Sequence, residues 1–237
     1  MRAAYREHLD NFSHDLIVMC DTVRTILDKA SQALLQGVLD SAEDALTMTE
    51  ELDEIRARCS ERAVKLLALE SPMAQDLRQV VSSIYIVEDL YRMGRLAQHI
   101  ADSARRRHPE SVVPTNYMGY FEEMYRLTEE MGSVLHDILV TPDADLSVNL
   151  RTDDDAVDDI NSHILRILTQ RGWEGTVREA VETSQITRYY ERYADHCVSV
   201  AGHIIYLTTG LLPHDYAKKL EEDKQDAEFE ARMAELE

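Results

Sequence analysis

Hydrophobic residues recur along most of the chain at intervals of three and four, which is the period of an α-helix with one buried face. In the first stretch these apolar positions are Leu9, Phe12, Leu16, Met19, Val23, Ile26 and Ala30. A later stretch repeats the pattern through Leu77, Val80, Val81, Ile84, Val87 and Leu90. Glycine and proline separate the stretches, Pro72 and Gly172 among them. The pattern predicts helices over residues 3–35, 40–69, 73–107, 115–140, 144–170 and 175–210.

The predicted helices form two sets of three whose sequences match. The offset between matched residues falls from 112 in the first pair of helices to 105 in the second and 100 in the third. It falls because the loops of the second set are shorter, and loops vary more than helices. Matched positions include Tyr5 with Tyr117, Leu52-Asp53-Glu54-Ile55 with Val157-Asp158-Asp159-Ile160, and Arg92 with Arg192.

Long amphipathic helices joined by short loops bury their apolar faces best as neighbours in a bundle. We therefore predict an all-α fold of two tandem, repeat-related three-helix bundles, over residues 1–108 and 115–213. Residues 214–237 form an acidic tail with nine acids and four bases. For this tail, a frayed helix and a disordered segment are both open.

Composition narrows the functional classes. Of 237 residues, 25 are basic and 45 acidic, so the formal net charge is −20. Such a surface repels phosphate backbones, which argues against binding to nucleic acid. Hydrophobic residues make up 44%, enough for a packed core. The three cysteines have no paired spacing and no run of 18 apolar residues occurs, so we expect a reduced, cytoplasmic protein.

Two acidic pairs in the second repeat are candidates for chemistry. Asp154 and Asp158 are four residues apart in one predicted helix, and Glu191 and Asp195 are four apart in the next. Each pair lies on one helix face, with Cβ atoms roughly 5–6 Å apart. Two such pairs on neighbouring helices can supply four carboxylates to a hard or borderline metal ion. The spacing leaves a second interpretation open, in which these acids are simply solvated.

The matching positions of the first repeat are Thr49, Asp53, Tyr91 and Arg95. They keep one of the four carboxylates, and they place a guanidinium, which has no lone pair for a metal, where Asp195 stands. We therefore expect any metal to bind in the second repeat alone. In the first repeat we expect Arg95 to pair with a neighbouring acid, Asp53 before others.

Other sequence motifs of catalysis do not occur. No histidine follows a glutamate by three residues, and there is neither a Gly-rich phosphate loop nor a Cys-x-x-Cys pair. We therefore expect a protein that is not an enzyme. A metal-dependent, carboxylate-rich helical-bundle enzyme is the alternative.

One basic run stands out in this acidic chain. Arg105-Arg106-Arg107 ends the third predicted helix. Three cations there complement the negative end of the helix dipole, or they contact an acidic partner. The sequence leaves both interpretations open.

Three segments resemble the members of one protein family. The segment MRAAYREHLDNFSHDLIVMCDTVRTILDKASQAL is similar to the first helix of that family. LLALESPMAQDLRQVVSSIYIVEDLYRMGRLAQHIA resembles its Pro…Asp-Leu-Arg stretch and the Leu-Glu-Arg-Ile-Gly-Asp motif that follows. RYYERYADHCVSVAGHIIYLTTG resembles the same motif again, with a Tyr-Leu-x-x-Gly ending. The family is PhoU, and the resemblance covers about residues 1–213.

The resemblance implies a regulatory adaptor and a homodimer. It implies negative control of phosphate-specific ABC transport and of two-component phosphate-starvation signalling while phosphate is plentiful. The implied partners are a PstB-like transporter ATPase and a PhoR-like sensor histidine kinase. Through them the protein would reach the inner face of the membrane, with no direct membrane contact of its own.

Some members of the family carry metal clusters on Asp/Glu-x-x-x-Asp motifs. The resemblance therefore implies a divalent or iron-type metal at the four carboxylates of the second repeat. In the first repeat Tyr91 and Arg95 stand where the family motif has Glu and Asp. That departure argues against a second cluster there.

Overall fold

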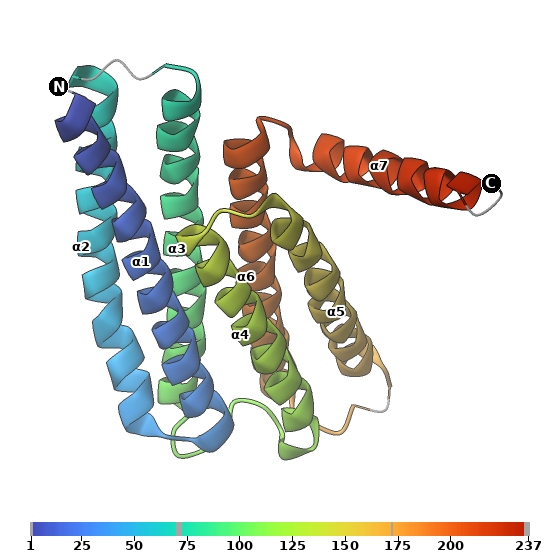
Figure 1. Cartoon of the computed structure of the whole chain (residues 1–237). Coiled ribbons are helices and arrows are strands. Elements are labelled where there is room, and N and C mark those ends of the chain that lie inside the picture. The colour runs from blue at the N-terminus through green and yellow to red at the C-terminus, as the bar shows by residue number, and fades with distance from the viewer. Residues whose placement is uncertain (1, 70–72, 172, 235–237) are drawn as a thin grey trace.

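Figure 1 shows the computed structural model of the chain, a set of helices joined by short loops. The structure describes residues 2–69, 73–171 and 173–234, so the predicted breaks at Pro72 and Gly172 lie outside the described residues. No described helix is long and apolar enough to cross a membrane. The elements are α1 (Arg2–Gln36), α2 (Leu39–Leu69), α3 (Gln75–Arg107), η1 (Thr115–Tyr117), α4 (Met118–Val140), α5 (Ala144–Thr169), α6 (Val177–Thr209) and α7 (Pro213–Ala234).

The first six α-helices confirm the helical pattern of the sequence to within a few residues at each end, and local signals explain several of these ends. The Asp143 side chain caps α5 by accepting hydrogen bonds from two backbone N–H groups of its first turn, at 2.8 and 3.1 Å. Thr176 and Glu179 form a capping box at the start of α6. α6 ends at Gly210, whose φ of 75° is a left-handed conformation that glycine adopts without a steric penalty.

The helices pack as two three-helix bundles. Each of α1, α2 and α3 packs against the other two, and α4, α5 and α6 do the same. The bundles lie side by side because α3 packs along α6 and α1 packs on α4, as Figure 1 shows. The predicted all-α fold of two repeat-related bundles is confirmed. The core contains the expected apolar faces, including Phe12, Met19 and Val23 of α1.

Gly94 explains one position of the family motif. A Cβ atom at Gly94 would collide with the Leu52 side chain, so the glycine lets α3 approach α2 closely. The matching residue in α6 is Ala194, which is fully buried. Both repeats therefore use a small residue at this position.

A buried polar cluster joins the bundles where α3 meets α6. Asp89 Oδ1 lies 2.9 Å from His196 Nδ1, and Asp89 Oδ2 accepts a hydrogen bond from Ser199 at 2.7 Å. His203 Nε2 lies 3.7 Å from the same Oδ2. Burial by itself would raise the pKa of Asp89, but the hydrogen bonds from His196 and Ser199 and the charges of both histidines bring it below its ordinary value. The carboxylate therefore stays ionised inside the interface.

The acidic tail, for which two states were open, is helical as α7. In Figure 1 this helix extends away from the two bundles. Its attachment lies at its first turn, where the Tyr216 hydroxyl donates a 2.8 Å hydrogen bond to Asp145 of α5. Gly202 of α6 has Pro213 as its close neighbour. The rest of α7 is mostly exposed over the part whose side chains are described.

Candidate metal centre

Two adjacent helices of the second bundle carry the four candidate carboxylates. Asp154 and Asp158 lie one turn apart on α5, and Glu191 and Asp195 lie one turn apart on α6. α5 and α6 pack against each other along their length. The apolar stripe of α5, which includes Leu150, Val157 and Ile164, holds this helix in register with its neighbours.

Burial differs among the four acids. Glu191 is only 7% exposed, whereas Asp158 is exposed and Asp154 and Asp195 are intermediate. Asp154 Oδ1 and Glu191 Oε2 are buried without a hydrogen-bond partner. A buried carboxylate oxygen with no partner is unfavourable and marks a position where a cation or donor would stabilise the fold.

The carboxylates also repel one another. Burial raises the pKa of Asp154 from 3.8 to about 6, with further contributions from Asp158 and Asp195. Burial and then Asp195 raise the pKa of Glu191, and the same two causes raise that of Asp158. These mutual effects place the four side chains in one electrostatic cluster, as the spacing of the sequence suggests.

Two arginines of α6 offset part of this negative charge. Arg188 pairs with Glu191 Oε1, and Arg192 Nη1 lies 3.6 Å from Asp195 Oδ2. Neither ion pair was among the interactions predicted from the sequence. The signal was present, because each arginine precedes its acid by three residues, a spacing that brings side chains together on a helix.

The donor set suits a hard or borderline cation, since it consists of carboxylates with two buried, unpartnered oxygens. As the side chains stand in the described part of the chain, no three acidic, His or Cys side chains converge closely enough to hold an ion. To bind a metal through Oε1, Glu191 would also have to give up its ion pair with Arg188. The donor chemistry therefore suits a cation, but the four side chains do not converge on one position in the described structure.

The matching positions of the first repeat hold a different arrangement. Thr49 is buried and its hydroxyl donates to the Ala45 carbonyl oxygen within α2, at 3.1 Å. Tyr91 faces Asp53, and burial followed by this carboxylate raises the pKa of the Tyr91 hydroxyl. Asp53 thus faces the Tyr91 phenol.

The expected ion pair between Arg95 and Asp53 is wrong. Near these positions Arg56 of α2 donates to both oxygens of Glu88 on α3, at 2.9 and 2.6 Å. The Arg56 guanidinium also lies 4.2 Å from the centre of the Tyr91 ring. Arg95 acts at longer range, where its charge lowers the pKa of Tyr91. The arginine that pairs across α2 and α3 near these positions is therefore Arg56 and not Arg95.

Comparison with known proteins now decides the family. The PhoU domain matches this chain twice, over residues 16–104 and 121–204. The phosphate-specific transport system accessory protein PhoU homolog 2 of Mycobacterium tuberculosis is 41% identical over 213 residues, which is 90% of this chain and all of that protein. The chain belongs to the PhoU family.

Other PhoU proteins agree in sequence and in fold. PhoU homolog 1 of Mycobacterium leprae is 41% identical over 215 residues, 91% of this chain and 97% of that protein. The crystal structure of PhoU from Pseudomonas aeruginosa superposes with a TM-score of 0.82 at 25% identity, covering 87% of this chain and all of the other. PhoU from Streptococcus pneumoniae, at 21% identity and a TM-score of 0.78, shares the fold. Both PhoU domain matches end before α7 begins.

Proposed function

We propose that this PhoU-family chain is a regulatory adaptor that restrains phosphate-specific ABC transport and phosphate-starvation signalling when phosphate is abundant. The observation that carries this proposal is the match to proteins named accessory proteins of the phosphate-specific transport system, over about nine tenths of the chain. An accessory protein acts on a transporter through contacts, which favours an adaptor over an enzyme. The partners are a PstB-like ATPase and a PhoR-like kinase at the inner membrane face, contacted by a homodimer.

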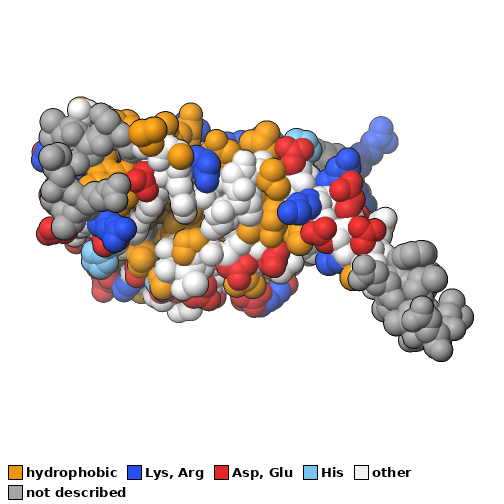
Figure 2. All heavy atoms as spheres, turned by 45° about the horizontal axis from the view of Figure 1, so that its top comes forward, with side chains coloured by type: hydrophobic (Ala, Val, Ile, Leu, Met, Phe, Trp, Pro, Cys, Tyr) orange, Lys and Arg blue, Asp and Glu red, His pale blue; other side chains and the backbone are white. Residues whose placement is uncertain are grey.

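Exposed apolar side chains offer a contact surface for such a partner. Val64 and Leu67 of α2 are 64% and 40% exposed, Met73 is 79% exposed, and Leu77 of α3 is 41% exposed. These four residues lie where α2 leads toward α3, and we call them the open-end patch. Figure 2, turned so that the upper end of the molecule in Figure 1 comes forward, shows hydrophobic side chains scattered among charged ones. Apolar residues exposed together commonly mark a protein-binding surface.

We also propose a divalent or iron-type cation at Asp154, Asp158, Glu191 and Asp195. The two unpartnered oxygens and the raised pKa values in this cluster support it. A bound cation would supply positive charge that cancels the repulsion between α5 and α6. The carboxylates of α5 and α6 would orient toward it, and Arg188 would release Glu191.

The test is deletion of the gene followed by complementation. Without the protein, phosphate uptake and phosphate-starvation genes should stay active in phosphate-rich medium, and the wild-type chain should restore repression. A double variant, Val64→Glu with Met73→Glu, should fail to restore it while keeping the wild-type melting temperature. Val140→Glu, at a residue 51% exposed at the end of α4, is the matched control and should restore repression.

The outcomes separate the alternatives. A deletion strain that still represses would contradict the adaptor role. Full repression by the double variant of the open-end patch would show that the partner binds a different surface. Turnover of a phosphate ester by the purified protein, lost on Glu191→Ala, would favour the helical-bundle enzyme.

A further inference from the structure

A cationic hollow lies between the C-terminal end of α3 and the first turns of α6. It has a volume of about 570 Å3, within the usual range of small-molecule sites. Its charged lining residues are Arg106, Arg107, Arg178 and Glu182. The lining thus gathers three arginines and one glutamate on a chain whose net charge is −20, and Asp102 and Glu110 pair with Arg106 and Arg107 beside it.

Arg107 is the most buried cation of the hollow. Its side chain is 14% exposed, and its Nε lies 3.5 Å from Glu182 Oε2. Neither atom has a hydrogen-bond partner, although both are buried. The pair is therefore close enough for charge attraction but does not satisfy the Nε–H donor or the carboxylate oxygen.

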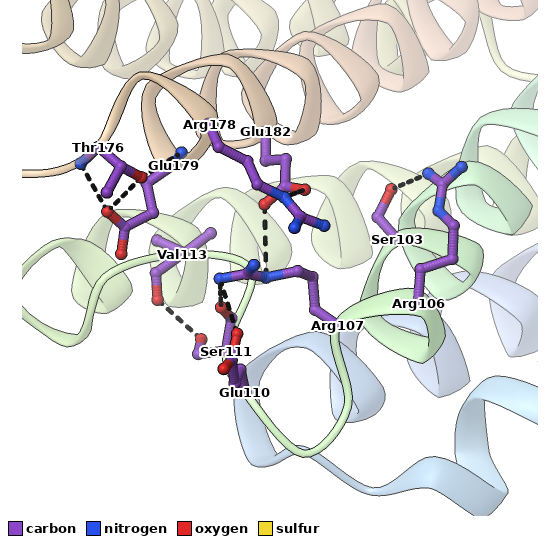
Figure 3. A network of polar contacts seen from close by, with 10 residues as sticks. All are labelled: Ser103, Arg106, Arg107, Glu110, Ser111, Val113, Thr176, Arg178, Glu179 and Glu182. Atoms are coloured by element: carbon purple, nitrogen blue, oxygen red, sulfur yellow. Dashed lines mark hydrogen bonds and ion pairs between the residues drawn. The ribbon is translucent and has the colours of Figure 1, made fainter.

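Glu182 lies between cations from both bundles. Its Oε1 accepts a 2.9 Å hydrogen bond from Arg178 Nε, while its Oε2 faces Arg107 Nε. Figure 3 shows Glu182 and Arg178 extending from α6 toward Arg107, with Arg106 beside Ser103 on α3. One carboxylate thus contacts an arginine of α3 and an arginine of α6 at once.

The other arginines of the run are engaged elsewhere. Arg105 and Arg106 both pair with Asp102 in their own helix, at 3.0 and 3.3 Å, and Arg105 Nη1 also lies 3.7 Å from Glu43 Oε2 of α2. These two fit the interpretation that the run complements the end of its helix. Arg107 departs from it, because it also reaches Glu182 of the other bundle.

We infer that this hollow is a binding site for a phosphate-bearing anion, which takes Arg107 and Arg178 from the Glu182 carboxylate. A phosphate group has more acceptor oxygens and more charge than a carboxylate, so it can satisfy the Arg107 Nε–H that Glu182 leaves unpaired. Arg178 is 66% exposed and can turn toward a ligand. The positive end of the α6 dipole lies at the same place.

Glu182 acts in this arrangement as an internal competitor. Without ligand it keeps the two guanidinium groups from repelling each other, and with ligand it is displaced. Because Arg107 belongs to α3 and Arg178 to α6, occupancy changes a contact between the bundles. The site is separate from the carboxylates of the second repeat, and the inference does not depend on the proposed regulatory role.

The experiment is a titration of the full-length protein with inorganic phosphate, AMP, ATP and sulfate. A chelator is present to remove metal ions, so that no anion binds through a metal. Calorimetry measures affinity. Fluorescence of Trp173, the single tryptophan, reports on the start of α6, where its Nε1 donates to the Thr176 carbonyl oxygen at 3.2 Å. Binding of inorganic phosphate identifies the free anion as ligand, and binding of AMP or ATP alone identifies a nucleotide phosphate.

Three variants locate the binding. Arg178→Gln should weaken it about tenfold or more, as expected for loss of one charge-assisted hydrogen bond. Glu182→Gln should strengthen it about tenfold by weakening the competitor. Arg126→Gln is the matched control and should have no effect, because Arg126 is half exposed and pairs with Glu123 and Glu130 within α4.

Two results would overturn the inference. One is the absence of binding by both the wild type and Glu182→Gln up to millimolar ligand. The other is equal weakening by Arg178→Gln and Arg126→Gln, which would indicate attraction to surface charge in general.

Discussion

Asp154 is the residue on which the second-repeat cluster has its clearest effect. Burial, followed by repulsion from Asp158 and Asp195, raises its pKa from 3.8 to about 6. Between these two values the folded chain holds more protons than the unfolded chain. The folded state therefore gains stability as the pH falls from about 6 toward 3.8, and above about 6 it carries the full unfavourable effect of the charge.

We predict that Asp154→Asn stabilises the metal-free protein near neutral pH. The pKa shift corresponds to about 3 kcal/mol, which solvent screening of this half-buried group reduces to about 1 kcal/mol. The gain should disappear at about pH 4, where Asp154 is largely protonated in the wild type. Urea unfolding with a chelator present, at these two pH values, measures both effects.

Asp226→Asn on the exposed part of α7 is the control and should change stability at neither pH. With a bound divalent cation the sign should reverse, because the substitution then removes a ligand. Destabilisation by Asp154→Asn in the presence of chelator would contradict the prediction, because it would show that the Asp154 charge does not destabilise the metal-free fold.

At this scale, the sequence could predict which acids share a helix face but not how each side chain is paired. Asp154 with Asp158, and Glu191 with Asp195, follow from helical period alone. The ion pair of Arg56 with Glu88 joins residues 32 positions apart on two helices. Several cations can lie near one acid, and side-chain rotamers and the distance between helices decide which of them reaches it. The spacing of residues along the sequence predicts neither.

Individual helices follow from local rules more fully than their pairing does. Asp143, the capping box of Thr176 and Glu179, and Gly210 mark the ends of α5 and α6 in the sequence itself. The contact between α2 and α3 does not follow from such rules. The sequence predicts Arg95 as the paired cation, whereas Arg56 of α2 is the arginine that stacks on Tyr91 and binds Glu88.

We predict that Arg56→Gln weakens the contact between α2 and α3 and lowers the free energy of unfolding by about 1 kcal/mol. The estimate reflects a bidentate pair that is 39% exposed on both sides, together with a cation–π contact. Chemical denaturation at moderate ionic strength gives the value, and the loss should shrink at high salt.

Arg95→Gln, on α3, provides the matched comparison. Arg95 forms no ion pair within the described residues, so removing its charge should change the free energy of unfolding by a few tenths of a kcal/mol at most. If Arg95→Gln proved as harmful as Arg56→Gln, the first repeat would rely on long-range charge and not on the Arg56 contacts.

At the scale of the whole molecule, the structure shows how the two bundles join. Repeat matching predicts two similar bundles but not the face on which they join. Asp89 shows why, because its partners His196 and Ser199 lie more than one hundred positions away. The residue that matches Asp89 in the second repeat is Tyr189, which stacks on His99 at a centroid distance of 5.3 Å. The joining surface is thus chemically asymmetric although the bundles are alike.

α7 is the element least connected to this assembly. Its described polar attachment to the bundles is the hydrogen bond from Tyr216 to Asp145, with Pro213 beside Gly202. A helix of this length gains little stability on its own in water, so its contribution to the bundles passes through that first turn. The segment carries nine acids and four bases, a quarter of the net negative charge of the chain.

We predict that removing residues 214–237 leaves the two bundles folded and lowers the melting temperature by no more than about 4 °C. The lost Tyr216 hydrogen bond contributes about 1 kcal/mol or less, and in a chain of this size that corresponds to a shift of about 2–4 °C. Tyr216→Phe in the full-length protein removes the same bond alone and should reproduce the shift. The truncated chain should also elute from an anion exchanger at lower salt, because five of its twenty net negative charges are gone. A much larger drop in melting temperature, with Tyr216→Phe unaffected, would instead show that α7 stabilises the bundles along its length.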